Sequence, residues 1–141
     1  MADKFYAKGP GNNGYIKNLE VLSFCDWDNK SGAFQMQLYR TEDGKYYIYG
    51  SAFGGIKGAS VVIAEVTDPE NPRFVNRMFA CDPEEYPTTT ISKVQVAEDK
   101  LICAMTAGSG PDALVDQGDG TTVKFLTRIY IYSLKEHPEN P

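Results

Sequence analysis

A short turn motif that occurs twice constrains the fold of this chain more than any other feature. Asp68-Pro69-Glu70-Asn71-Pro72 follows a β-rich run at residues 60–66, and a partial copy, Pro138-Glu139-Asn140-Pro141, follows a similar run at 128–134. β-branched and aromatic residues dominate both runs, as is typical of strands, and Pro, Asn and Asp follow them. The same strand and the same turn, occurring twice in order, indicate an internal repeat.

Two further landmarks recur in the same order. Cys25-Asp26 returns as Cys81-Asp82, and each pair opens a polar loop. Thr41-Glu42-Asp43-Gly44-Lys45 returns, one residue shorter, as Ala97-Glu98-Asp99-Lys100. Both of these segments lie between strand-like runs, and Gly and Asp tolerate the positive φ of tight turns, so we expect two hairpins. Repeats of several strands each are typical of β-propellers.

The residues around the first turn resemble a known family. A strand that ends in Val66-Thr67-Asp68-Pro69, with Pro72 and a short strand at 73–77 behind it, resembles the LVIVD-type β-propeller repeat. The resemblance covers residues 17–141 and is most specific over 60–77. The second copy departs from the pattern, with Lys135-Glu136-His137 before its Pro. The resemblance implies a propeller fold and a binding surface, and it implies no catalytic residues that carry over to this chain.

The pattern of apolar runs predicts an all-β, propeller-like chain with about two four-stranded antiparallel blades. An N-terminal arm at 1–16 precedes the blades, which cover about 17–80 and 81–141. By alternation we expect Val61, Ile63, Ile129 and Ile131 to be core positions between the stacked blades. The expected strands are 18–24, 33–40, 46–52, 60–66, 73–80, 91–96, 101–106 and 123–134.

Two blades cannot close a ring, because propellers typically have four to eight. The expected order, from innermost strand A to outermost strand D, is D-A-B-C-D-A-B-C, which leaves open sheet edges. We therefore expect other chains to complete the ring, with a homotrimer as first choice and residues 18–24 of one chain completing the last blade of the next. A second, longer chain, a truncated chain, or residues 18–24 folding back on their own chain are the alternatives.

Four connections are expected on one face of the blades, around the mouth of the central channel: 25–32, 51–59, 81–90 and 107–122. Polar and aromatic side chains on such loops are candidates for ligand binding. Trp27 could stack on a sugar or an aromatic ring, or it could pack between blades while its Asp neighbours cap the turn. The acidic residues of the second loop could bind a ligand or form a solvated surface. The candidate ligand-binding residues are Asp26, Trp27, Asp28, Lys30, Asp82, Glu85 and Tyr86.

Metal and cofactor signals are weak. Asp112, Asp116 and Asp119 lie among glycines and offer oxygen ligands, but their spacing does not match the helix-flanked calcium loop. The three cysteines form no Cys-x-x-Cys pair, and the single His137 lies in the C-terminal turn, on the opposite face from the candidate loops. We therefore expect no cofactor and no metal, and we expect reduced thiols in a cytoplasmic protein.

Charge and hydropathy argue against two classes of partner. The net charge is −5, and Lys and Arg are scattered, so nucleic acid and anionic membrane surfaces are not expected partners. No run reaches the roughly 18 apolar residues that a membrane span needs.

The sequence therefore favours a ligand- or protein-binding propeller module assembled from short chains, with the four loops as its binding surface. The alternative is an enzyme, or an enzyme subunit, with an acidic pocket at the channel mouth acting on a small polar, sugar-like or aromatic substrate. A third possibility is a structural subunit whose active partner is a different chain.

Overall fold

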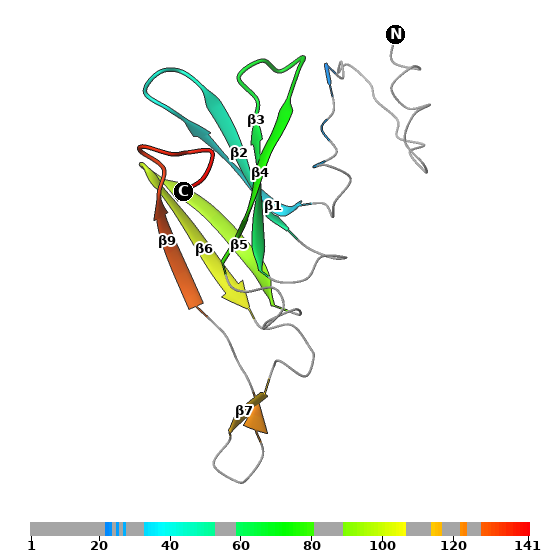
Figure 1. The fold of residues 1–141 in the computed structure, drawn as a ribbon, viewed down its shortest axis with the longest axis vertical. Helices are drawn as coiled ribbons and strands as arrows, with labels where there is room; N and C mark the ends of the chain where they lie inside the picture. Colours follow the sequence, from blue (N-terminus) through cyan, green and yellow to red (C-terminus); the bar gives the residue numbers. More distant parts are fainter. Residues whose placement is uncertain are drawn as a thin grey trace, which may run out of the picture.

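The structure, a computed structural model, describes residues 22, 23, 25, 27, 33–52, 59–80, 89–106, 114–116, 122–123 and 128–141. Within these residues the chain is all-β and contains no helix, which confirms the all-β part of the predicted fold. Two antiparallel sheets lie against each other, and a small hairpin extends beyond them (Figure 1).

The first sheet is a four-stranded meander in the order β1-β2-β3-β4. Each strand pairs antiparallel with the next along the chain, as expected for the first blade. Its strands are β1 (Ala33–Arg40), β2 (Tyr46–Ala52), β3 (Ser60–Glu65) and β4 (Arg73–Phe79).

The second sheet has the order β5-β6-β9 and contains three strands among the described residues, the number expected from this part of the chain. Its strands are β5 (Thr90–Ala97), β6 (Lys100–Thr106) and β9 (Arg128–Ser133). The predicted single strand at 123–134 is wrong at its start, because β8 (Thr122–Val123) pairs with β7 (Leu114–Asp116) in a separate hairpin. The expected strand at 18–24 lies mostly outside the described residues, and Leu22 and Ser23 are not in a strand.

The two predicted hairpin turns are confirmed. The Thr41 amide donates to the Lys45 carbonyl over 2.9 Å, and Gly44 closes the turn at φ +89°, a conformation that favours glycine. In the second hairpin Glu98 has a φ of 52°, which the tight two-residue connection requires.

The repeated Pro-Glu-Asn-Pro motif forms the same turn at both places. The Asn71 amide donates to the Asp68 carbonyl over 3.1 Å, and the Asn140 amide donates to the His137 carbonyl over 3.0 Å. Each turn follows the third strand of its sheet, so the sequence repeat corresponds to a repeat of local structure.

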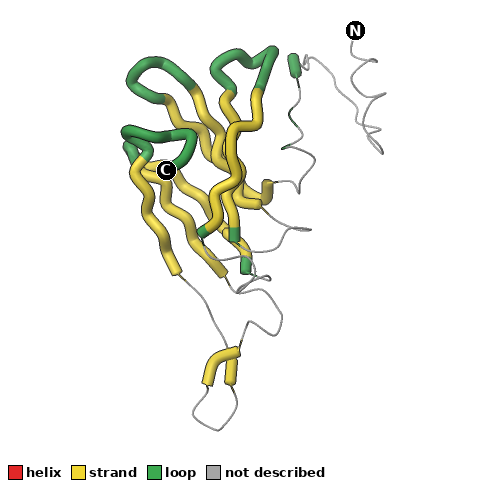
Figure 2. The backbone as a smooth tube through the Cα atoms, viewed as in Figure 1, coloured by secondary structure: helices red, strands yellow, loops and turns green. Residues whose placement is uncertain are grey.

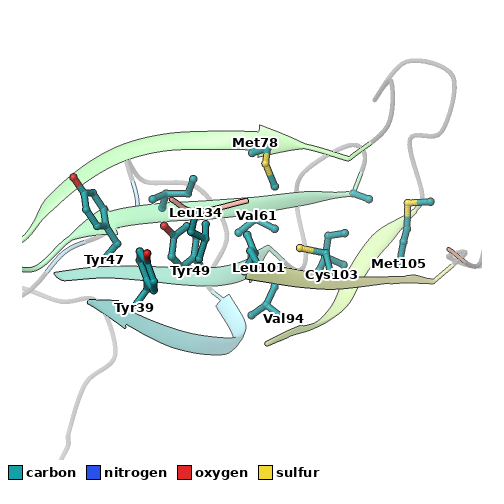
Figure 3. Close-up of a cluster of buried hydrophobic side chains, with 13 residues drawn as sticks. Tyr39, Tyr47, Tyr49, Val61, Met78, Val94, Leu101, Cys103, Met105 and Leu134 are labelled. Carbon is teal, nitrogen blue, oxygen red and sulfur yellow. The ribbon is translucent and has the colours of Figure 1, made fainter. Parts of the chain in front are cut away.

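The core lies between the two sheets, and side chains from both inner faces fill it (Figure 3). Val61 and Ile63 are fully buried there, as predicted. The first sheet contributes Tyr39, Tyr47, Tyr49, Val61, Ile63 and Met78, and the second contributes Ile91, Val94, Leu101, Cys103, Met105 and Leu134.

The prediction that Ile129 and Ile131 are core positions is wrong for this chain. Their side chains are 70% and 63% exposed. The reason is the register of β9, in which Tyr132 pairs with Leu101 and Tyr130 pairs with Cys103. Cross-strand partners share a face of the sheet, so the two tyrosines turn toward the core and the two isoleucines turn away from it.

Candidate functional site

The turns between the described strands, with the C-terminal turn, gather at one end of the two sheets (Figure 2). The strand ends that flank residues 53–58, 81–88 and 107–113 lie at the other end. Most of the predicted ligand-binding residues lie on those connections or in the preceding loop. Outside the described residues are Asp26, Asp28, Lys30, Asp82, Glu85, Tyr86, Asp112 and Asp119. Their grouping into one site therefore stays a prediction.

Trp27 and Asp116 are the predicted site residues that the structure describes. Trp27 lies in a turn, is half-buried, and has a φ of 54°, which is uncommon for a residue other than glycine. Asp116 is the last residue of the short strand β7. The described residues do not bring these two together with any other candidate, and no group of three or more His, Cys, Asp or Glu among them could hold a metal ion.

A cavity of about 490 Å³ lies at the opposite end of the sheets, between the turns. We call it the turn-end cavity. Its walls come from both sheets and from the C-terminal turn, and they include Tyr39, Lys45, Tyr47, Asp99, Lys135 and Glu139.

Two buried tyrosines, Tyr39 and Tyr47, line the turn-end cavity. The Tyr39 hydroxyl donates to Asp99 Oδ1 over 3.0 Å, a bond that joins β1 of the first sheet to the hairpin turn of the second. Burial and this hydrogen bond raise the pKa of Tyr39, and burial raises the pKa of Tyr47. Both side chains therefore stay protonated at neutral pH. The Tyr39 proton is donated to Asp99, and the Tyr47 hydroxyl can donate a hydrogen bond to a ligand.

The charges around the cavity are predominantly negative. Carboxylates outnumber ammonium groups among the lining residues, so the cavity favours a ligand that carries positive charge. The acidic residues are Glu42, Asp43, Asp99, Glu136 and Glu139, and the basic residues are Lys45 and Lys135.

The C-terminal turn closes one side of the cavity because it is bound to the first sheet. The Tyr49 hydroxyl donates to the Pro138 carbonyl over 2.6 Å, and Asn76 Nδ2 donates to Asn140 Oδ1 over 3.0 Å. Tyr49 and Asn76 are on β2 and β4, so the end of the second repeat is held against two strands of the first.

The turns that line this cavity were predictable from the sequence, but nothing in their residues indicated a function. One signal for the site was present in the printed sequence. Tyr39, Tyr47 and Tyr49 alternate with outward-facing residues, and buried tyrosines near the end of a strand place polar hydroxyls at the rim of a core. The contribution of Asp99 could not be predicted, because it depends on how the second sheet packs on the first.

The outer faces of the two sheets form a second unusual feature. On β1, the alternating residues Phe34, Met36 and Leu38 are 65%, 54% and 57% exposed. On β9, Ile129 and Ile131 form a similar exposed pair, beside Ile102 and Ala104 of β6. We call these the β1 stripe and the β9 stripe, and they lie on opposite outer faces of the two-sheet stack.

No family model, curated protein or solved structure matches this chain. Within the part of the chain that the structure describes, no helix is long and apolar enough to cross a membrane.

Proposed function

We propose that this chain is a protein-binding module of the β-propeller type, which contacts its partner through the outer faces of its two sheets. One observation carries the proposal: each outer face presents a stripe of large apolar side chains that are more than half exposed. Contiguous apolar surface of this kind marks interaction sites on soluble proteins. The repeated turns and the face-to-face packing of two meander sheets support the propeller-type arrangement.

The β1 stripe allows a direct test. Replacing Phe34 and Leu38 by Ser removes apolar surface from the outer face and leaves the buried inner face unchanged. Light scattering measures the mass of the purified protein and of a crosslinked native complex. We expect the higher-mass species that the wild type shows in either sample to be absent from the variant. Glu70→Ser, a change in the exposed turn before β4, is the matched control. An unchanged mass in the stripe variant contradicts the proposal.

A ligand-binding surface on the loops 25–32, 51–59, 81–90 and 107–122 is part of the same proposal. Three of these segments connect strands at the same end of the sheets, which supports a shared surface there. The enzyme alternative rests on the acidic residues of the same loops. The double variant Asp82→Asn with Glu85→Gln should weaken ligand binding under either hypothesis. The two single variants distinguish the hypotheses. Only the enzyme alternative expects that one of them loses turnover and still binds the ligand.

Binding of a small cationic ligand in the turn-end cavity is a second candidate function. The cavity has a volume typical of small-molecule sites, two protonated tyrosines and an excess of carboxylates. Titration calorimetry with a diamine, a neutral amide and a sugar of similar size tests it. We expect heat from the diamine alone, reduced in the exposed variant Glu42→Gln, and equal responses to all three probes would contradict a cation site.

The compartment that we propose is the cytoplasm, because of the cysteine usage described above.

A further inference from the structure

We infer that the partner of the two outer faces is a second copy of this chain, with the β9 stripe of one copy docked on the β1 stripe of the next. The inference rests on the proposed protein-binding function and adds the identity and orientation of the partner. The observation behind it is that equivalent apolar residues of the two repeats are buried in one repeat and exposed in the other.

The two hairpins show this reversal for the first two strands of each sheet. Aligning the turns at Lys45 and Lys100 makes Val94 the counterpart of Leu38, and Cys103 the counterpart of Ile48. Leu38 and Ile48 are cross-strand partners in the first sheet, and Val94 and Cys103 are cross-strand partners in the second. Leu38 is exposed on the outer face, whereas Val94 and Cys103 are fully buried against the first sheet.

The third strands show the converse. Aligning β3 and β9 at their first residues makes Ile129 the counterpart of Val61, and Ile131 the counterpart of Ile63. Val61 and Ile63 are fully buried against the second sheet, and their counterparts are exposed. The exposed residues Leu38, Ile129 and Ile131 therefore correspond to the apolar residues Val94, Val61 and Ile63, which the other repeat buries.

This correspondence defines how a second copy fits. Within one chain, the face of the first sheet that carries Val61 and Ile63 packs on the face of the second sheet that carries Val94 and Cys103. The β9 stripe is equivalent to the face that carries Val61 and Ile63. The β1 stripe is equivalent to the face that carries Val94 and Cys103. Applying the same packing step again places the β1 stripe of a second copy on the β9 stripe of the first.

The resulting contact is heterologous, because two different surfaces meet, and it must close into a ring to avoid a filament. Each copy contributes two sheets, so a ring of about three copies contains about six, within the four to eight blades of propellers. A trimer is the assembly that we propose, and the docking of the stripes is the part that the experiment tests first.

Two complementary variants test the docking. Leu38→Asp blocks the β1 stripe and leaves the β9 stripe intact, and Ile131→Asp does the reverse. Both residues are more than half exposed, so the single chain should fold with either change, and circular dichroism checks this. If one Asp variant does not fold, the corresponding Ser variant replaces it. Light scattering then gives the mass of the wild type, each variant alone and their equimolar mixture.

We expect an oligomer for the wild type, monomers for each variant alone, and a heterodimer in the mixture, because one intact stripe of each kind remains. An Ile131→Asp variant that still self-associates would overturn the inference, since the β1 stripe would then bind itself. A monomeric wild type that forms a native complex with a different protein, lost in the variants, overturns the inference and leaves the proposed function standing. A monomeric wild type with no such complex overturns both.

Discussion

The reversal of faces predicts that two isoleucines at equivalent positions contribute very differently to the stability of the single chain. Ile63→Ala removes three fully buried carbon atoms, which at about 0.8 kcal/mol each gives roughly 2.4 kcal/mol before any cavity term. Measured values for such buried substitutions are about 2–5 kcal/mol. Ile131 is 63% exposed, so the same substitution there loses only about a third of that transfer energy, roughly 1 kcal/mol or less.

Urea unfolding of both variants measures the difference. The experiment is done at protein concentrations where the urea midpoint does not depend on protein concentration, so that self-association does not contribute to the measured stability. We expect Ile63→Ala to lower the free energy of unfolding by at least about 1.5 kcal/mol more than Ile131→Ala, with an unchanged slope. Equal losses in the two variants under these conditions would refute the assignment of inner and outer faces.

Three further predictions concern single interactions. Tyr49→Phe removes the hydrogen bond to the Pro138 carbonyl and should lower the free energy of unfolding by about 1 kcal/mol, measured in urea. Hydrogen bonding to Arg73 lowers the pKa of Glu65 below its ordinary 4.5, so the stability that Glu65 contributes is present above pH 4.5 and is lost as the pH falls through the lowered pKa. The variant Glu65→Gln should therefore lose stability less steeply in acid than the wild type, and identical pH profiles would contradict this. Burial raises the pKa of Cys103 to about 12, so mass spectrometry should find it unmodified by iodoacetamide at mildly alkaline pH until urea unfolds the protein.

Local signals in the sequence were sufficient to predict much of the fold. The turn residues of the two hairpins, with Gly44 at positive φ, were recognisable because each residue type has its own conformational preference. The repeated Pro-Glu-Asn-Pro turn was recognisable for the same reason, and both copies make the same backbone hydrogen bond. These features depend on a few neighbouring residues, and tertiary packing does not change them.

Features that depend on the packing of distant segments were not predictable. The chain near Val123 alternates like the rest of the expected strand, but its partner is β7, so β9 begins only at Arg128. The turn-end cavity likewise requires Asp99 of the second sheet to meet Tyr39 of the first, across 60 residues of chain. No local pattern specifies either pairing.

The error at Ile129 and Ile131 has a different origin, and it bears directly on what the protein does. Alternation identifies which residues of a strand share a face, but it does not say whether anything covers that face. In a stack of only two sheets, one face of each sheet is covered and the other is not. The second repeat keeps apolar residues at positions equivalent to Val61 and Ile63, although the described chain places nothing of its own over them. The sequence pattern is therefore that of a buried face, which is why we propose that a second copy of the chain covers it.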